Sequence, residues 1–378
     1  MNTINILKQL VGFDTTSHNS NLELIDWIGG YLSDHNVQHE RIPDATGEKF
    51  NLRASIGPSN ANGFVLSGHT DVVPVKGQDW HTNHFNLVQK DDRLYGRGSA
   101  DMKGFLASVL AAVPAMKQTD LARPIHLAFT YDEEVGCLGV PSLIDGFSPA
   151  AAVIVGEPTS MKVVDNHKGG LSEQIVVKGI AAHSSMPDLG VNAIEFASQA
   201  IREISMLGEW LETQEIQVTE TTKARSTVSV GKISGGVAHN IIPEHCEFVW
   251  SLRLAPGHDA SQIRERLHRK ITEIESRMQR SHSDCNINFE VLIEIPSLIP
   301  DKNSFARDLC LGLTGEKEAI GVNFGNEAGF FSQAKYSTVV CGPGSIDQAH
   351  KPNEYIEISQ LKQCDQFIER LIQKAKTE

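Results

Sequence analysis

Short apolar runs alternate with helical patterns along the first 155 residues. The pattern predicts helices over 21–33 and 103–116, and strands over 63–67 (GFVLS), 124–131 (PIHLAFTY) and 151–155 (AAVIV). Strands that alternate with helices in this way are typical of a largely parallel sheet with helices on both faces. This part of the chain is therefore expected to form an α/β domain.

The middle of the chain has a different pattern. Strands are expected over 171–178, 227–233 and 246–254, and two long helices over 191–213 and 261–280. The loop lengths favour antiparallel strands, so these elements indicate a small α+β domain.

The α/β pattern returns after residue 287. It predicts a helix over 304–313, a strand over 338–342 and a last helix over 359–374. One α/β domain interrupted by an inserted α+β domain is the simplest arrangement, and a chain of 378 residues is long enough for more than one domain. The expected boundaries are 1–169 and 288–378 for the α/β domain and 170–287 for the insertion.

Composition and charge narrow the class of protein. Hydrophobic residues make up 40% of the chain and charged residues 21%, which is typical of a globular protein with a large core. The formal net charge of −13 argues against nucleic-acid binding and leaves no basic patch for a membrane surface. The longest nearly apolar run, 105–116, contains Pro114 and is much shorter than the ~20 residues of a membrane-spanning helix.

The N-terminus and the cysteines indicate the compartment. The start, MNTINILKQL, contains no apolar stretch long enough for the core of a signal peptide. The six cysteines are widely scattered and none forms a C-x-x-C pair, so free and mostly buried thiols are expected. Together these features predict a cytoplasmic protein.

Histidines and carboxylates follow the predicted strands of the α/β domain. His69 and Asp71 come directly after GFVLS, and residues 132–134 (Asp-Glu-Glu) follow PIHLAFTY. Glu157 follows AAVIV, and His350 lies in the loop after the last predicted strand. Because the carboxyl ends of parallel strands meet at one edge of a sheet, these side chains are expected to lie close together.

Asp101 lies in a glycine-rich loop, YGRGSADMKG, just before a predicted helix, which it could also cap. The loop is not a G-x-G-x-x-G motif, because Asp101 occupies the last position, and it lacks the Gly-Lys-Ser/Thr of a phosphate-binding loop. The chain also contains neither G-x-S-x-G nor H-E-x-x-H. Nucleotide-binding, serine-hydrolase and H-E-x-x-H metalloprotease functions are therefore weakly supported.

So many carboxylates at one sheet edge would repel one another unless a cation neutralised them. Imidazole together with carboxylate suits zinc, or cobalt or manganese, and one aspartate can offer an oxygen to each of two ions in a hydrolytic site. Of the adjacent Glu133 and Glu134, one can bind metal while the other takes a proton from the attacking water. Asp71 is placed to orient His69.

These motifs resemble those of the co-catalytic zinc amidohydrolases and exopeptidases. The matching segments occur in the family's order and are spread over nearly the whole chain. They are SGHTDVVP (67–74), DRLYGRGSADMKG (92–104), YDEEVGCLG (131–139), VGEPT (155–159), AAHSSMPDLGVNAI (181–194), GGVAHNIIP (235–243) and GPGSIDQAHKPNEYI (342–356).

The resemblance implies a zinc-peptidase-like catalytic domain that binds one or two Zn²⁺, for which Co²⁺ can substitute. Asp101 would bridge the ions, Glu133 would be the general base, and Asp71 would hold a histidine ligand. The implied metal ligands are His69 and Glu157 in the first site, Glu134 and His350 in the second, and Asp101 in both.

The resemblance also implies that the inserted domain is a lid through which the protein forms a homodimer. His183 would reach the active site of the partner subunit and polarise the scissile carbonyl, although it could instead be an ordinary loop histidine. Arg253 would pair with the substrate carboxylate, or else be an exposed charge on a lid strand. Further substrate contacts are expected at Asn240, Gly344, Ser345 and Glu327.

The implied activity is hydrolysis of the amide bond of an N-acyl amino acid. The segments GRGSADMKG, EEVG, GEPT and FGNEAGFF (324–331) most resemble those of family members that act on N2-acetyl-L-ornithine. This resemblance implies N2-acetyl-L-ornithine as substrate, giving L-ornithine and acetate for arginine biosynthesis. Deacetylation of N-acetylcitrulline, desuccinylation of succinyl-diaminopimelate and dipeptide hydrolysis are alternatives within the family. A non-catalytic metal-binding homologue is the alternative from another class, and the free carboxylate of Glu133 argues against it.

Overall fold

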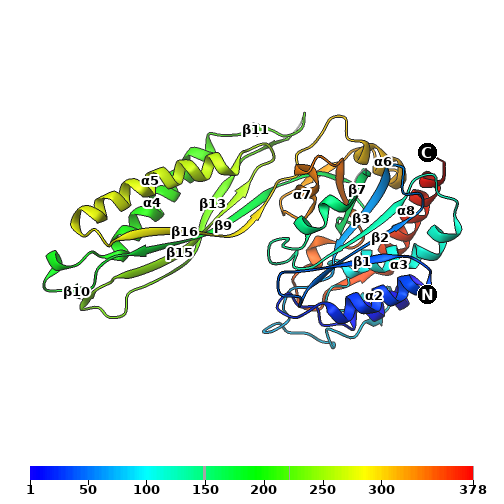
Figure 1. The fold of residues 1–378 in the computed structure, drawn as a ribbon, viewed down its shortest axis with the longest axis horizontal. Helices are drawn as coiled ribbons and strands as arrows, with labels where there is room; N and C mark the ends of the chain where they lie inside the picture. Colours follow the sequence, from blue (N-terminus) through cyan, green and yellow to red (C-terminus); the bar gives the residue numbers. More distant parts are fainter. Residues whose placement is uncertain (148–149, 221, 378) are drawn as a thin grey trace. The chain divides into compact units, whose positions relative to one another are not determined.

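The computed structural model describes residues 1–147, 150–220 and 222–377. The chain forms two compact units, each described here by itself. The first contains Met1–His167 and Pro300–Glu378, and the second contains Lys168–Ile299 (Figure 1). The expected boundary at residue 287 falls inside strand β16 (Asn286–Ile295), which pairs with β9 (Gly169–Lys178) in the sheet of the second unit.

A twisted sheet forms the centre of the first unit. Strands β3, β6, β7 and β18 pair in parallel, whereas β1 and β2 extend one edge in antiparallel fashion. Beyond β18, β8 pairs antiparallel to it and parallel to β17. In spatial order the strands are β1 (His39–Pro43), β2 (Phe50–Ile56), β6 (Ile125–Thr130), β3 (Gly63–His69), β7 (Ala150–Pro158), β18 (Thr338–Gly342), β8 (Val164–His167) and β17 (Ile320–Val322).

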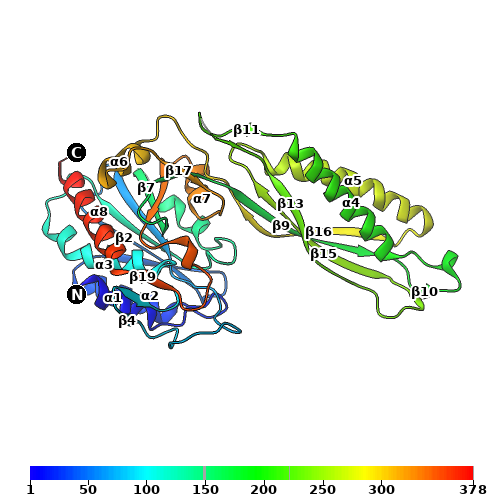
Figure 2. The same cartoon turned by 180° about the vertical axis from the view of Figure 1, so that it is seen from behind.

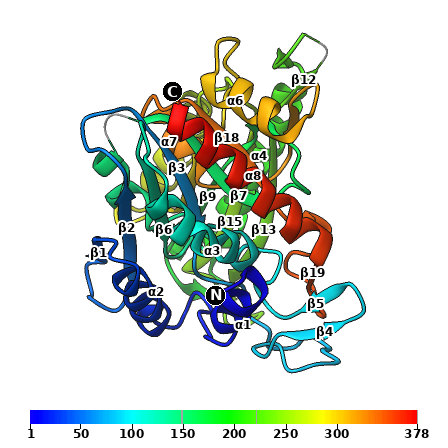
Figure 3. The same cartoon turned by 90° about the vertical axis from the view of Figure 1, so that its right-hand side faces the viewer.

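One face of this sheet carries the main hydrophobic core. Alternate residues such as Phe64 and Leu66 of β3 are completely buried there against apolar side chains from five helices. Helix α3 contacts both α1 and α8 (Figure 3). The five helices are α1 (Thr3–Val11), α2 (Leu22–Asp34), α3 (Lys103–Gln118), α6 (Phe305–Thr314) and α8 (Ile358–Thr377).

Shorter elements cover the opposite face. Ser67 and Thr130 point to that face and contact Glu327 at the start of α7 (Ala328–Gln333), and His126 packs on Phe147. Helices therefore lie on both faces of a mostly parallel sheet, as the sequence predicts. The remaining elements of the unit are η1 (Val140–Ser142), η2 (Ile144–Phe147), η4 (Ile346–Gln348) and a small sheet of β4 (Val88–Lys90), β5 (Arg93–Tyr95) and β19 (Tyr355–Glu357).

The second unit is an antiparallel sheet with two helices packed on one face (Figure 2). Alternate residues of β15, such as Phe248 and Trp250, are buried beneath these helices. The sheet contains β13 (Thr227–Gly235), β15 (His245–Leu254), β9 and β16, and the helices are α4 (Ala193–Glu212) and α5 (Ala260–Ser281). Short elements complete it: β10 (Ala182–His183), η3 (Pro187–Leu189), β11 (Ile216–Gln217), β12 (Lys223–Ala224) and β14 (Ile241–Ile242).

Every helix and strand predicted from the hydrophobic pattern is confirmed, with ends that differ by a few residues. The six cysteines are free and buried, also as expected. Within the described residues, none of the helices combines the length and apolar character that crossing a bilayer requires.

Candidate metal centre

The carboxyl ends of neighbouring parallel strands deliver most of the candidate residues. His69 is the last residue of β3, and Glu133 and Glu134 follow the end of β6 directly. Glu157 lies near the end of β7, next to β3 in the sheet, and His350 follows β18. The parallel register pairs His69 with the last residue of β6, so these chain ends meet at one edge.

His69 is completely buried and faces carboxylates on both sides of its ring. Its Nε2 lies 3.2 Å from Oδ1 of Asp101 and 3.9 Å from Oε1 of Glu157. Its Nδ1 lies 2.9 Å from the carbonyl oxygen of Asp71. Burial lowers the pKa of His69, but hydrogen bonds to Asp101 and Asp71 outweigh burial and raise the pKa well above its usual value.

His350 forms the second half of the cluster. Its Nε2 lies 2.9 Å from Oε2 of Glu134 and 3.4 Å from Oδ2 of Asp101. Asp101 therefore lies between the two histidines, with one oxygen near each. The side chain of His350 is 58% exposed, whereas those of Asp101 and Glu134 are 7% and 6% exposed, so the cluster reaches solvent on the side of His350.

The carboxyl groups of the cluster lie close enough to disfavour one another's charged forms. Burial raises the pKa of Glu133 and Glu157 well above that of an exposed glutamate, and neighbouring carboxylates raise it further. Burial also raises the pKa of Glu134 to about 7. Asp101 differs, because hydrogen bonds with the two histidines outweigh burial and hold its pKa well below the usual range. A bound cation would relieve this repulsion.

The donors fit a divalent cation. Single ligand atoms of His69, Asp101 and Glu134 lie within 4.8 Å of one another, and so do those of His69, Glu133 and Glu157. Oε1 of Glu157 is buried and has no hydrogen-bond partner among the described residues. Such an orphaned oxygen calls for an explanation, and an ion between it and His69 supplies one. Imidazole and carboxylate ligands suit zinc or cobalt.

Asp71 organises the backbone around the cluster. Its carboxylate accepts hydrogen bonds from the backbone N–H of Glu133 at 3.0 Å and of Glu134 at 3.3 Å. The hydroxyl of Ser17 donates a third, at 2.7 Å. One buried side chain therefore joins the end of β3, which carries His69, to the loop that follows β6.

Glu354 is a residue of the centre that the sequence did not single out. It is buried, forms an ion pair with Arg97 at 2.8 Å, and accepts hydrogen bonds from the backbone N–H groups of Gly98, Ala100 and Asp101. These contacts fix the loop that presents Asp101. Its only signal in the sequence was its place in the segment GPGSIDQAHKPNEYI.

Glu133 has few hydrogen-bond partners compared with its neighbour. It is half-buried, and its Oε1 accepts a weak hydrogen bond from the thiol of Cys137 at 3.4 Å. Glu134, in contrast, forms an ion pair with His350. The two adjacent glutamates thus have different environments, which allows them different roles.

Three of the residues singled out in the sequence belong to the second unit. His183, Asn240 and Arg253 are all exposed there. Nδ1 of His183 is held by the N–H and hydroxyl of Ser185, at 3.2 and 2.8 Å. The backbone carbonyl of Asn240 accepts a hydrogen bond from the N–H of Ser184, so the β10 and β14 segments lie side by side.

The other expected substrate contacts lie in the first unit. Gly344 has a φ of +89°, and a Cβ there would lie 3.1 Å from the Cβ of Ala100, next to Asp101. Ser345 is partly exposed in the same loop. Glu327 differs, because it is completely buried and its two carboxylate oxygens accept hydrogen bonds from hydroxyls of the sheet. This burial leaves it without the exposed surface that contact with a substrate side chain requires.

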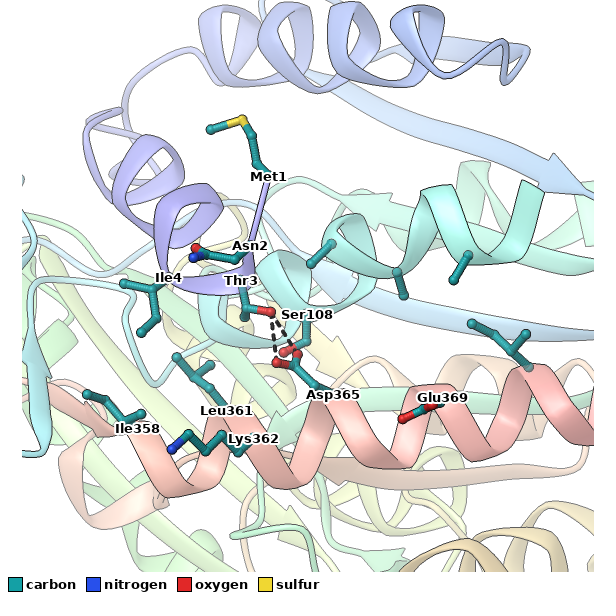
Figure 4. Close-up of a pocket in the computed structure, with 14 residues that line it drawn as sticks. Met1, Asn2, Thr3, Ile4, Ser108, Ile358, Leu361, Lys362, Asp365 and Glu369 are labelled. Atoms are coloured by element: carbon teal, nitrogen blue, oxygen red, sulfur yellow. Dashed lines mark hydrogen bonds between the residues drawn. The ribbon is translucent and has the colours of Figure 1, made fainter. Parts of the chain in front are cut away.

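A hollow of about 440 Å³ lies elsewhere in the first unit (Figure 4). It is bordered by the start of α1, by α3 and by α8, and Thr3 donates to both oxygens of Asp365 at its edge. None of the residues of the cluster lines this hollow. It is therefore separate from the candidate metal centre.

Known proteins resemble the chain in sequence and in fold. The profile of peptidase family M20/M25/M40 matches residues 65–374. Acetylornithine deacetylase of Salmonella arizonae is 35% identical over 357 residues, covering 93% of this chain and 91% of that protein.

Two solved structures illustrate the similarity of fold. A tripeptidase of Staphylococcus aureus has a TM-score of 0.75 at 20% identity. The alignment covers 100% of this chain and 98% of the tripeptidase. A dinuclear metal-binding peptidase of family M20 from Bacillus subtilis has a TM-score of 0.69 at 16% identity, with the same coverage. At such low identity these two structures indicate the fold alone.

Proposed function

The chain belongs to peptidase family M20/M25/M40 and is a hydrolase of that family, and from this premise we propose that it deacetylates N2-acetyl-L-ornithine. The products are L-ornithine and acetate, and the reaction serves arginine biosynthesis. The observation that carries the proposal is the buried cluster of histidines and carboxylates with Glu133 beside it. The identity to an acetylornithine deacetylase supports the choice of substrate.

His69, Asp101, Glu134, Glu157 and His350 would hold one or two Zn²⁺ ions, with Co²⁺ as a substitute. A bound ion supplies Lewis-acid chemistry, which polarises the acyl carbonyl and makes water more acidic. Glu133 takes the proton from the attacking water and delivers it to the leaving amine nitrogen. Its raised pKa, caused by burial and by nearby carboxylates, suits both steps. Asp71 holds the tautomer of His69.

The second unit would complete the site in a homodimer. Exposed apolar side chains gather on and beside β10 and β14, where His183 lies, and such patches on a protein surface are typical of interfaces. His183 would polarise the scissile carbonyl in the partner's site, while Asn240 and Arg253 contact the amide and the α-carboxylate of the substrate. Gly344 and Ser345 would contact the substrate from their loop. The exposed apolar residues are Met186, Leu189, Val237 and Ile241.

The free thiols and the biosynthetic reaction both fit a cytoplasmic enzyme. The competing substrates are N-acetylcitrulline, succinyl-diaminopimelate and dipeptides. These differ from N2-acetyl-L-ornithine in the acyl group, in the side chain or in both, so one panel of substrates separates them.

The decisive experiment measures acetate release from N2-acetyl-L-ornithine by the purified protein. The assay uses the protein as isolated, the protein after chelation, and the protein after Zn²⁺ or Co²⁺ is restored. Each competing substrate is assayed in the same way. Turnover that disappears on chelation, returns with metal and prefers N2-acetyl-L-ornithine is expected. Metal-dependent turnover of another substrate would reassign the pathway. Metal binding without hydrolysis of any member of the panel would show a non-catalytic homologue.

A further inference from the structure

Glu327 is a buried carboxylate that the proposed mechanism does not use. It precedes α7 and is 0% exposed. Its Oε1 accepts a hydrogen bond from the hydroxyl of Ser67 at 2.5 Å, and its Oε2 accepts one from the hydroxyl of Thr130 at 2.8 Å. Among the described residues, no Lys, Arg or His lies within ion-pair distance of it. A carboxylate in such a place is costly, and only neutral donors hold it.

The two donors belong to the strands that supply the metal centre. Ser67 lies on β3 two residues before His69, and Thr130 is the last residue of β6, three residues before Glu133. These strands are parallel neighbours, and His69 pairs with Thr130 in the register. Glu327 therefore joins the ends of β3 and β6 from the face that α7 covers.

A second contact joins the same strand ends. The N–H and hydroxyl of Thr70 both donate to the carbonyl oxygen of Thr130, at 2.8 and 2.7 Å. Thr70 binds the backbone of Thr130, and Glu327 binds the side chains of Ser67 and Thr130. Both contacts hold β3 and β6 together close to the proposed ligands.

We propose that Glu327 is a positioning residue for the metal centre, which fixes the separation of His69 from Glu133 and Glu134 by holding Ser67 and Thr130 together. The proposal rests on the proposed function, because it takes the cluster to be a metal site. Residues that orient ligands in this way affect metal affinity without touching the ion. Glu327 thereby acts through its neighbours and not on the substrate.

The test is a titration of metal-free protein with Zn²⁺ in competition with a chelator, together with its melting temperature. Glu327→Ala is expected to weaken Zn²⁺ binding about 10-fold, the lower end of the loss seen when a hydrogen-bond partner of a ligand is removed, because Glu327 reaches the ligands only through Ser67 and Thr130. Glu327→Gln is expected to retain most of the affinity. Its amide oxygen can accept a hydrogen bond from one hydroxyl, and its NH₂ group can donate one to the oxygen of the other. Thr130→Val, which removes one donor at nearly constant shape, should weaken binding less than Glu327→Ala.

Glu173, another fully buried carboxylate, provides the control. It is also 0% exposed and is held by the indole N–H of Trp250 at 3.1 Å, by His268 at 2.8 Å and by an ion pair with Arg264 at 3.3 Å, but it lies in the second unit. Glu173→Gln is expected to lower the melting temperature and leave Zn²⁺ affinity unchanged. The proposal is overturned if Glu327→Ala, or Thr130→Val where the alanine variant does not fold, binds Zn²⁺ as tightly as the wild type. If the wild type itself binds no Zn²⁺, the proposed function fails instead.

Discussion

At the scale of single residues, the two adjacent glutamates of the centre are distinguished by their partners. Glu134 lies 2.9 Å from His350, whereas the side chain of Glu133 accepts, among the described residues, only the weak thiol hydrogen bond of Cys137. Because Glu133 is not held by a cationic side chain, it is free to exchange a proton. In the proposed mechanism, these different neighbours assign Glu134 to the ion and Glu133 to proton transfer.

Glu133→Ala is expected to keep bound metal and to lose turnover. General acid–base catalysis contributes about 10²–10⁴-fold, so kcat should fall by a factor of that order. Metal content is measured by elemental analysis and kcat by acetate release. Unchanged kcat in the variant would contradict the assignment of Glu133 as the base.

His126 makes a pH-dependent contribution to stability away from the centre. Burial and the nearby Arg53 lower its pKa from 6.5 to about 4, and its Nδ1 lies 2.7 Å from the hydroxyl of Ser55. Between these pKa values the unfolded chain binds a proton that the folded protein does not. The free energy of unfolding therefore falls as the pH falls below 6.5 and is unaffected well above it.

His126→Gln, which cannot gain this proton, should lose less stability than the wild type when the pH falls from about 7 to about 5. The difference in the free energy of unfolding is expected to be about 1–2 kcal/mol. Urea unfolding of both proteins at the two pH values measures it. The exposed His18→Gln should follow the wild type. Equal losses in wild type and His126→Gln would refute the effect.

At the scale of elements, a loop and a distant segment depend on each other. The loop from Arg97 to Asp101 has no regular structure of its own, and Glu354 binds its backbone at three N–H groups. The chain between Glu354 and β5 is long, but β19 pairs with β5 and brings the two segments together. The position of Asp101 is therefore set by a strand pair as well as by its own loop.

Glu354→Gln should destabilise the protein and weaken metal binding together. Breaking a buried ion pair such as Arg97–Glu354 typically costs about 3–5 kcal/mol, and the loop loses an acceptor for its N–H groups. Melting temperature and Zn²⁺ affinity are the measurements. Glu357→Gln, on the same segment but 41% exposed, is the control and should change neither. A stable Glu354→Gln protein with normal affinity would contradict this dependence.

The same elements show how far sequence patterns reach. The positions of His69, Glu134 and Glu157 just after predicted strands indicate that they lie close together, because the carboxyl ends of parallel strands lie at the same edge of a sheet. Glu354 could not be found in this way, since its bonds to Ala100 join positions 254 residues apart and follow no period. Helix α1 has only 9 residues, too few for a clear helical period, and went unpredicted. Strand β16 was missed because most of its side chains are not buried, which weakens the alternation of apolar and polar residues.

At the scale of the whole molecule, the proposed catalytic groups lie in two separate units. Glu133 and the metal cluster belong to the first, and His183 belongs to the second. In the proposed homodimer, each complete site takes the base from one subunit and the histidine from its partner. A subunit that lacks Glu133 and a subunit that lacks His183 can therefore together form one complete site.

Mixing the Glu133→Ala and His183→Ala proteins should therefore restore activity. If subunits exchange at random, half of the dimers are mixed and each has one intact site, so about a quarter of wild-type activity is expected. Acetate release is measured before and after exchange, and mixing two batches of Glu133→Ala serves as the control. No recovery despite exchange of subunits would show that His183 does not act in the site of a partner.

The order of strands in the first unit has a consequence for biosynthesis. Strand β18 lies between β7 and β8, yet the ribosome makes it only after the whole second unit. Until then, the growing chain has an open edge on β7, and unpaired edges promote association with other chains. His350 and Glu354 emerge later still. A chain that terminates before β18 is therefore expected to aggregate and not to bring together the residues of the candidate metal centre.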